Sequence, residues 1–328
     1  PPVRLVPTLV ATLPIGAVPR QAMISGNGRR VFVPTAAGMA VLDTTGPLTG
    51  ASISTIPLSG ERSSPVGAFP HSGGILSPDG RRIYVPVVKP DARSGLDVID
   101  TTTMRVTGFL AHGNRPALTA SLDISPDGTT LYASVIDVGT QPLSTVLKII
   151  HAGTGAVSKE IPLGEGYAGV RVAVPGASAF ALRLALNDSP AGPTAAAVDL
   201  QAGTLGADLP VSFPIGMAMA ADRATAHVSV SGGFAVIDTA SGAVRRMVPV
   251  TSSRAFTAAL TPDGSMLCYT PSAGVSVLDV ASGAVTGSVA YRLTGSPGPI
   301  SLAPDGRRAY VPDPGSDALL VVDLVPAP

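Results

Sequence analysis

The sequence is poor in cysteine and lacks tryptophan, with Cys268 as the single thiol in 328 residues. One cysteine excludes an internal disulfide, and its place in an apolar run predicts a small buried side chain rather than a reactive thiol. Long hydrophobic runs are also missing. Glycine or proline interrupts each apolar stretch well before the roughly 20 residues that a transmembrane helix needs. We therefore expect no transmembrane segment.

Charged residues are scarce too, at 13% of the chain, and they balance at 22 basic and 22 acidic. They are scattered along the sequence, so there is no basic patch for nucleic acid or for an anionic membrane surface. Only three glutamates are present, Glu61, Glu160 and Glu165. We expect no nucleic-acid partner and no metal site, because a metal ion needs several converging oxygen ligands.

Glycine and proline are abundant by contrast, with 37 and 32 residues, while apolar types still make 45% of the chain. This composition predicts a folded chain of many short strands joined by tight turns rather than a disordered one. The length alone is compatible with one domain or two.

One phrase recurs along the chain and marks an internal repeat. Its turn residues lie 41 to 52 residues apart. The clear copies are SPDGRRIYV (77–85), SPDGTTLYA (125–133), TPDGSMLCY (261–269) and APDGRRAYV (303–311), and the weaker ones are SGNGRRVFV (25–33), VPGASAFAL (174–182) and AADRATAHV (220–228). Pro-Asp-Gly favours a hairpin turn, because proline fixes φ, aspartate caps its own turn and glycine accepts a positive φ.

Two more strand-like segments follow each copy. The first ends in an Asp-Thr turn, as in VLDTTG (41–46) and VIDTTT (98–103), and the second closes the unit, as in ISTIPLSG (53–60). Each repeat therefore predicts a four-stranded antiparallel meander, and its length is that of a propeller blade.

The two ends of the chain complement each other. The last repeat stops at VVDLVPAP without a fourth strand, while LVATLPIG at residues 9–16 precedes the first repeat. Pairing the two would close the last blade and remove a free sheet edge. We predict an all-β fold with one domain over residues 1–328: a seven-bladed β-propeller of four-stranded antiparallel blades whose N-terminal strand completes the last blade. The predicted blades cover residues 16–58, 66–113, 114–164, 165–213, 214–250, 251–291, and 292–328 with 1–15.

These phrases resemble the repeats of the YVTN family of β-propeller proteins, which are related to the lactonase-like seven-bladed propellers. The resemblance covers essentially the whole chain. It implies a bacterial or archaeal protein, exported or at the cell surface, from a group without a settled activity in which some relatives are lactonases or lyases. The fourth repeat departs from the pattern at Pro175 and Gly176, which blurs the boundaries near residues 165–213. A chain that begins at Pro1 predicts a processed export signal or a shortened chain, with a cytoplasmic location as the alternative.

The repeat separates turn-forming residues from candidate site residues. Aspartates at repeated turn positions are expected to accept backbone N–H groups within their own turns. They are Asp79, Asp127, Asp222, Asp263 and Asp305 in the first turn, and Asp43, Asp100, Asp199, Asp238, Asp279 and Asp323 in the second. His151 replaces such an aspartate and His227 replaces a repeat tyrosine, so both are expected to be part of the scaffold. The arginines that follow the first turn are expected on the solvated surface: Arg29, Arg30, Arg81, Arg82, Arg307 and Arg308.

Ligands of propellers bind at one mouth of the central channel, where the segments leading into the inner strands converge. His71 and His112 lie in such segments and follow no repeat position. Together with Arg115 they are the candidate catalytic residues of a metal-free acid–base mechanism, in which a histidine abstracts a proton and arginine holds the developing oxyanion. The alternative is that both histidines are exposed or locally bonded loop residues.

Arginine recurs in these pre-strand segments. Arg20, Arg115 and Arg254 take equivalent places and Arg171 lies nearby, which predicts an anion site because guanidinium groups match carboxylate and phosphate geometry. The alternative is a structural role, with these arginines bonded to inner-strand carbonyls or paired with acids. The acids in question are Asp123, Glu165 and Glu61.

Three more residues are candidates for ligand contact. Glu61 and Phe69 belong to a long segment, residues 59–74, that is a candidate lid or a variable insertion. Glu165 directly precedes the inner strand of the fourth repeat.

Catalytic motifs are missing from the sequence, which has no G-x-S-x-G, H-E-x-x-H, paired C-x-x-C or P-loop pattern. We therefore expect no cofactor. The first hypothesis is a scaffold or binding module that presents a site at the channel mouth, either for a small molecule, anions included, or for a protein. The alternative is a metal-free lactonase, lyase or cyclase. The partner is expected to be a small molecule or a protein at one propeller face, and the protein is expected to be a monomer.

Overall fold

The structure is a computed structural model that describes residues 4–48, 51–62, 73–140, 143–174, 176–183, 192–250, 257–271, 274–294 and 297–326. Within these ranges every regular element is a β-strand and no residue is helical. The part of the chain that is described consequently has no helix capable of crossing a lipid bilayer.

The chain divides into two compact units, residues 1–55 with 215–328 and residues 56–214. The strands of the first unit are β1 (Leu5–Pro14), β2 (Met23–Ile24), β3 (Arg30–Thr35), β4 (Gly38–Asp43), β5 (Ile53–Ile56), β19 (Gly216–Met219), β20 (Thr225–Val230), β21 (Gly233–Asp238), β22 (Val244–Pro249), β23 (Ala258–Leu260), β24 (Met266–Tyr269), β25 (Val275–Asp279), β26 (Val285–Val289), β27 (Ser301–Leu302), β28 (Arg308–Asp313) and β29 (Ala318–Pro326). They form four antiparallel sheets of four strands each.

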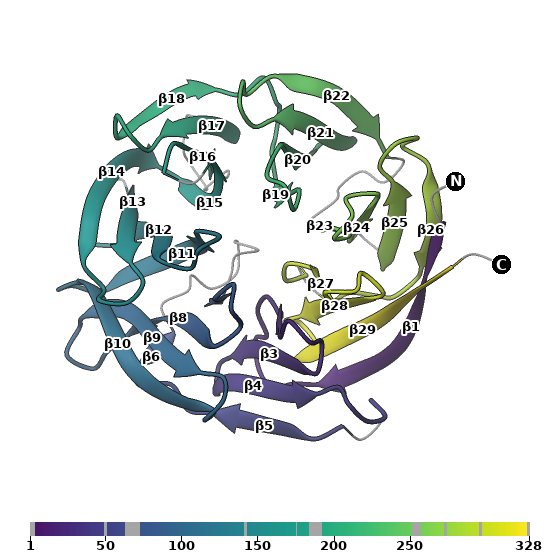
Figure 1. Cartoon of the computed structure of the whole chain (residues 1–328), viewed down its shortest axis with the longest axis horizontal. Coiled ribbons are helices and arrows are strands. Elements are labelled where there is room, and N and C mark those ends of the chain that lie inside the picture. The colour runs from purple at the N-terminus through teal and green to yellow at the C-terminus, as the bar shows by residue number, and fades with distance from the viewer. Residues whose placement is uncertain are drawn as a thin grey trace. The chain divides into compact units, whose positions relative to one another are not determined.

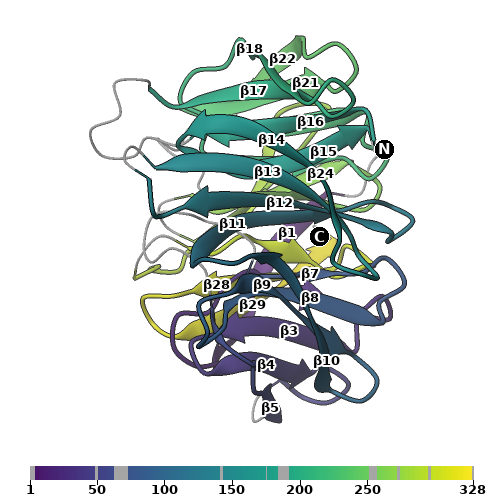
Figure 2. The same ribbon diagram turned by 90° about the vertical axis from the view of Figure 1, so that its left-hand side faces the viewer.

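The second unit contains the strands β6 (Glu61–Arg62), β7 (Ile75–Leu76), β8 (Arg82–Val88), β9 (Ser94–Asp100), β10 (Arg105–Gly113), β11 (Ala117–Ile124), β12 (Thr130–Asp137), β13 (Ser144–His151), β14 (Val157–Glu165), β15 (Tyr167–Val174), β16 (Ser178–Arg183), β17 (Thr194–Asp199) and β18 (Thr204–Asp208). They form three sheets, and Figure 2 shows one of them, β11 to β14, in chain order.

Each sheet is one blade, numbered here in chain order. Blades 1 to 6 are β2–β5, β6–β10, β11–β14, β15–β18, β19–β22 and β23–β26, and blade 7 is β27–β29 with β1. Blade 2 departs from the four-strand pattern, because β6 and β7 both pair with β8 and together take the place of one inner strand. β6 lies before residue 66, where the sequence predicted this blade to begin.

Blade 7 combines the two ends of the described chain. β1 pairs antiparallel with β29 from Leu5 opposite Pro326 to Pro14 opposite Ala318, with a bulge between Leu9 and Ala11. Figure 1 shows this purple strand beside the yellow one. The fold is therefore a seven-bladed β-propeller, and the predicted pairing of the N-terminal strand with the last blade is confirmed.

The middle strands are buried along almost their full length, whereas outer strands such as β14 alternate between buried and exposed residues. This follows from strand geometry, because successive side chains point to opposite faces of a sheet, and the middle strands have both faces covered. In the first unit, Val31 and Leu42 of blade 1 pack in one cluster with Leu13 and Leu319 of blade 7. The clusters of core residues thus join neighbouring blades within a unit.

Candidate functional site

His112 lies near the end of β10, the outer strand of blade 2, and not in a loop as the sequence suggested. Its side chain is buried, with Nε2 3.3 Å from Thr119 Oγ1. Nδ1 has no hydrogen-bond partner among the described residues. Burial, and to a lesser degree the charge of Lys148, lower the pKa of His112 to about 4, so the imidazole is neutral at pH 7.

Lys148 holds the backbone of β10 at His112. Its Nζ donates to the His112 carbonyl at 2.7 Å and forms an ion pair with Glu160 at 2.9 Å. The imidazole is thus held in the contact between two blades of the second unit. It can serve as a neutral base only for a substrate that displaces this packing, so the geometry gives His112 a structural role.

Arg115 is presented to solvent, with a side chain that is 75% exposed. One guanidinium nitrogen, Nη2, lies 3.1 Å from a carboxylate oxygen of Asp137, at the end of β12. An exposed ion pair of this kind contributes about 0–1 kcal/mol to stability and leaves most of the guanidinium accessible. The sequence did not single out Asp137, because its position carries no distinguishing motif.

The other described arginines of the predicted anion site are engaged by the protein. Arg171 lies within β15, and its Nη1 donates to the Val170 carbonyl at 2.9 Å. Arg20 is buried, its backbone N–H donates to the Pro34 carbonyl at 2.9 Å, and burial lowers the pKa of its guanidinium. A bond from arginine to an inner-strand carbonyl is what the structural alternative predicted for Arg171. The anion site itself stays a prediction.

The acids named for this region have different environments. Asp123 accepts the backbone N–H groups of Val172 and Ile124, both at 2.8 Å, and so links β11 to β15. Glu61 is exposed in β6, opposite Val88. Glu165 is half-buried at the end of β14, opposite Ser144.

Three candidates, His71, Phe69 and Arg254, lie outside the described residues. Of the long segment 59–74, the structure describes residues 59–62 and 73–74. At its start the fully buried Asp97 carboxylate accepts the N–H of Ser59 at 2.7 Å and also its hydroxyl, and Lys89 Nζ lies 3.8 Å away. This network anchors the segment to β9, and neither Ser59 nor Lys89 was singled out from the sequence.

Most of the repeated aspartates are turn formers as predicted. Each of ten accepts a backbone N–H two or three residues ahead, and they are Asp43, Asp79, Asp100, Asp127, Asp199, Asp222, Asp238, Asp263, Asp279 and Asp305. Such bonds favour the ionised form, and they lower the pKa of Asp100 below its usual range. Each of these carboxylates therefore gives at least one of its acceptor positions to the scaffold.

Asp323 is the exception, because it forms no turn. Its partner Arg308 was expected to be solvated, and that prediction is wrong as well. Asp323 accepts Nε and Nη2 of Arg308 at 2.5 and 3.1 Å, so neither residue behaves as the repeat suggested. The reason is chain connectivity: β29 continues straight to Pro326 and leaves no turn N–H groups for the carboxylate. Arg308 is opposite Asp323 in the sheet, and its side chain is only 28% exposed rather than solvated.

The two scaffold histidines occupy the places that the sequence predicted. His151 Nδ1 lies 3.2 Å from the N–H groups of Gly153 and Thr154, which is the role of the aspartate it replaces. His227 is buried in β20, neither ring nitrogen has a partner among the described residues, and desolvation lowers its pKa to about 4.

Two residues that the sequence did not single out have a positive φ before a proline. Phe213 precedes β19 with φ of 52° and is 63% exposed, and Val18 has the same φ in the segment before β2. Residues other than glycine rarely adopt this backbone conformation, and strained backbone and exposed aromatic side chains are both features of binding surfaces. The shared Val-Pro and Phe-Pro pairs, at equivalent places in two repeats, were the available sequence signal.

No group of three or more histidine, cysteine, aspartate or glutamate side chains in the described ranges is placed to hold a metal ion. The expectation of a site without metal or cofactor stays a prediction.

No protein-family profile and no curated protein matches this sequence. Among solved structures, a chain of hydrazine synthase from Kuenenia stuttgartiensis is similar, with a TM-score of 0.71 and 17% sequence identity. The match covers 96% of this chain and 97% of that chain. At this identity the similarity shows the propeller fold and no activity.

Proposed function

We propose that the chain is a binding module that takes a partner on the side where the chain enters its inner strands. One observation carries this: in the pre-strand segments of the described chain, the Arg115 side chain is 75% exposed and the residue Phe213 is 63% exposed, whereas Arg20 is buried and Arg171 donates to a backbone carbonyl. Exposed aromatic and arginine side chains are the types that dominate binding energy at protein interfaces.

The described histidines favour this proposal over the enzymatic one. His112 and His227 are buried, and His151 holds a turn. A general base must come within hydrogen-bond reach of the proton it abstracts, directly or through one water. His112 and His227 are not presented for that, and the exposed His151 uses Nδ1 to hold its turn, so the enzymatic alternative rests mainly on His71.

The proposal also includes the location of the protein and the kind of partner that it binds. The YVTN-like repeats favour an exported or surface protein, and the exposed Phe213 favours a protein partner over a small anion. The hydrazine synthase chain shares the fold, and its activity is not transferred to this chain.

Photo-crosslinking in the native host tests the proposal. A photoreactive phenylalanine analogue, p-benzoylphenylalanine, replaces Phe213, and as a control it replaces Met247, which is 55% exposed in the outer strand β22. We expect one defined crosslinked product from position 213 that Arg115→Ala weakens and that position 247 does not give. Equal labelling from both positions, or none from position 213, would overturn the proposal.

The enzymatic alternative has its own test. Purified wild-type chain and the His71→Ala and His112→Ala variants are assayed against a panel of small lactones and esters. We expect no turnover that depends on either histidine. Turnover by the wild type that is abolished by His71→Ala at unchanged melting temperature would establish the alternative.

A further inference from the structure

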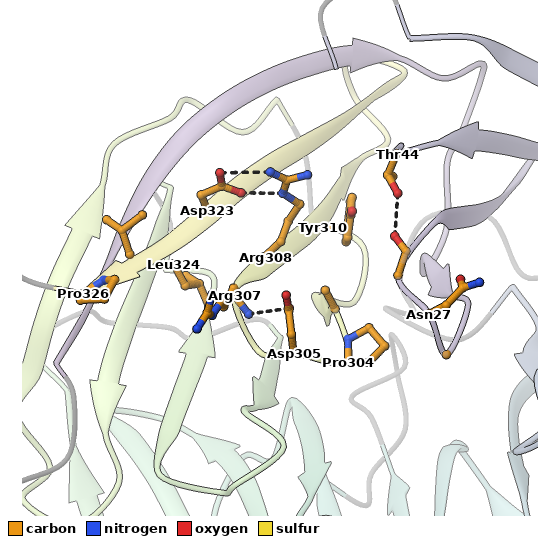
Figure 3. Close-up of a pocket in the computed structure, with 14 residues that line it drawn as sticks. Asn27, Thr44, Pro304, Asp305, Arg307, Arg308, Tyr310, Asp323, Leu324 and Pro326 are labelled. Atoms are coloured by element: carbon orange, nitrogen blue, oxygen red, sulfur yellow. Dashed lines mark hydrogen bonds and ion pairs between the residues drawn. The ribbon is translucent and has the colours of Figure 1, made fainter. Parts of the chain in front are cut away.

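A cavity of about 640 Å³ opens between blade 7 and blade 1, within the first unit. Figure 3 shows the side chains on its wall, with Arg308, Asp323 and Tyr310 on one side and Asn27 and Thr44 on the other. No motif in the sequence predicted this cavity, and none of the candidate site residues lies on its wall.

The cavity lies where blade 7 lacks a turn that other blades have. In blades 1 and 2 the residue after the second-turn aspartate is a threonine, and its hydroxyl donates to the hairpin glycine of the same blade. Thr44 bonds the Gly28 carbonyl at 2.6 Å, and Thr101 bonds the Gly80 carbonyl at 2.8 Å. In blade 7 the equivalent residue is Leu324, and the chain runs on along β1 instead of folding back.

A second hydroxyl is missing from the same wall. In blade 2, Asp79 accepts both the Ser77 hydroxyl at 2.6 Å and the Arg81 N–H at 3.0 Å. In blade 7 the serine position is Ala303, and Asp305 accepts only the Arg307 N–H, at 3.0 Å, among the described residues. Ala303, Asp305 and Leu324 all line the cavity. The Asp305 carboxylate can therefore accept a further hydrogen bond. In blade 2 the equivalent carboxylate, Asp79, accepts that bond from a serine hydroxyl.

Donors are present beside this acceptor. Arg307 is exposed, and Asn27 uses its Oδ1 to accept the Arg29 N–H at 3.1 Å, so its Nδ2 group is left to donate. The formal charges on the wall cancel, because Arg307 and Arg308 balance Asp305 and Asp323. Such a wall offers no net attraction to an ion, but it matches a neutral group that both donates and accepts.

The edge of β29 disfavours an added peptide strand. Leu324 N–H already donates to the Arg307 carbonyl at 2.7 Å, and Pro326, two residues on and facing the same side, has no N–H. A ladder of backbone bonds cannot be extended along this edge without those donors.

We propose that this cavity binds an uncharged, hydroxyl-rich ligand of the saccharide class. A sugar hydroxyl takes the place of the missing serine hydroxyl on Asp305, neighbouring hydroxyls accept from Asn27 Nδ2 and Arg307, and the apolar face of the sugar ring lies against the exposed Pro304 and Pro326. This site shares no residue with the proposed partner-binding side, and its test is independent of it.

Titration of the full chain with D-glucose, D-galactose, D-mannose, N-acetyl-D-glucosamine and cellobiose, followed by isothermal calorimetry, tests the proposal. We expect saturable binding of at least one of them. Asp305→Asn and Arg307→Ala are expected to weaken that binding about tenfold or more, since each removes a charged hydrogen-bond partner of the ligand. Asn27→Asp keeps the turn acceptor, removes the Nδ2 donor and is expected to weaken binding as well.

The repeat supplies matched controls. In blade 5 the serine position is also an alanine, Ala220, and Asp222 accepts one N–H, from Ala224 at 2.9 Å. This blade differs from blade 7 because it keeps the second turn, in which the Thr239 hydroxyl donates to the Arg223 carbonyl. Asp222→Asn and Arg81→Ala are therefore expected to leave saccharide binding unchanged. Equal melting temperatures for Asp305→Asn and Asp222→Asn separate lost binding from lost folding.

Three outcomes would overturn the proposal. The first is the absence of binding by all five sugars up to about 50 mM, where even weak sites saturate. The second is binding that the cavity variants and the controls weaken equally. The third is binding of citrate, or of the acetylated peptide DTTTMRV, in place of the sugars. This peptide is residues 100–106 and contains the turn that blade 2 has and blade 7 lacks. Either result would make the cavity an anion site or a peptide site.

Discussion

Blades 2 and 7 carry the same hairpin phrase, PDGRR, and the same aspartate at the end of their third strand, yet these residues have different partners. In blade 2, Asp100 accepts the N–H groups of Thr102 and Thr103 at 2.9 and 2.7 Å, and Arg82 is exposed. In blade 7, Asp323 is bonded twice to Arg308. The two pairs are opposite each other in the same register of their sheets.

The difference comes from where the fourth strand originates. Blade 2 takes its fourth strand, β10, from the next stretch of chain, so a turn follows Asp100 and supplies donors. Blade 7 takes β1 from the other end of the chain, so the turn is missing and the carboxylate is satisfied across the sheet instead. A residue's role in a repeat is thus set by connectivity as well as by its place in the phrase.

The largest expected effect concerns the fourth strands themselves. Leu13 of β1 and Leu110 of β10 are equivalent, opposite Leu319 and Leu96. Leu13 is 7% exposed and packs in the cluster that joins blades 7 and 1. We expect Leu13→Ala to lower the free energy of unfolding by about 2–5 kcal/mol, and Leu110→Ala to cost less because Leu110 is only partly buried.

Urea denaturation measures both variants, with Val10→Ala as the control because Val10 is 44% exposed in the same strand. An equal loss for Leu13→Ala and Val10→Ala would show that β1 does not hold blade 7 together.

The next largest effect is a difference between blades 2 and 7 in their response to acid. His112 has a pKa of about 4 in the fold against 6.5 for an ordinary histidine, so the unfolded chain binds the proton more readily between these values. Stability therefore falls as the pH drops from 6.5 to 4, by ~3 kcal/mol at most for this group. Blade 7 contains no histidine.

Hydrogen exchange at pH 7 and pH 4.5 checks this, and we expect faster exchange in β10 and β11 than in β28 and β29 at the lower pH. His112→Phe is the control. If it leaves the acid response of β10 and β11 unaltered, another group is responsible.

The two aspartates give a smaller effect. Asp100→Ala leaves two turn N–H groups without their acceptor, and we expect it to cost about 1–2 kcal/mol. Asp323→Ala breaks a partly exposed ion pair and is expected to cost about 1 kcal/mol or less. Asparagine reverses the order, because Asp100→Asn keeps a turn acceptor while Asp323→Asn loses the charge. Melting temperatures of the four variants test this ranking, and the same order for alanine and asparagine would contradict it.

The smallest effect is expected at the arginines. Arg308→Ala removes both bonds to Asp323 and is expected to cost about 0.5–1 kcal/mol, whereas Arg82→Ala at an exposed position should cost less than about 0.3 kcal/mol. Raising the salt concentration should shrink the difference, since salt screens partly exposed ion pairs. Chemical denaturation at low and high salt measures it, and a difference that salt leaves unchanged would argue against an ionic origin.

The residues that the sequence placed correctly obey local rules. Asp79 and Asp100 form turns because their own side chains reach the N–H groups two or three residues ahead, and His151 does the same with Nδ1. The pairing of β1 with β29 was also predictable, because a strand lacking at one end of the chain was supplied at the other. These features depend on neighbours in the chain or on counting repeats.

The candidate site was less predictable, because it depends on where side chains point. His112 and Arg115 are three residues apart, yet one is buried against Thr119 and the other is exposed beside Asp137. Nothing in the local pattern distinguishes them. The network of Ser59, Lys89 and Asp97 likewise joins residues that are far apart in the sequence.

The sequence by itself determined the number of blades, their turns and the source of the last strand, because hydrophobic alternation and turn chemistry are local and repeat with the chain. Only the tertiary structure decided that Asp323 holds Arg308, that His112 is buried, and that a cavity opens beside Asp305. The physical reason is that burial and pairing depend on which neighbouring strand or turn covers a residue. In blade 7, that cover is set by a strand whose residues are some 300 positions away in the chain.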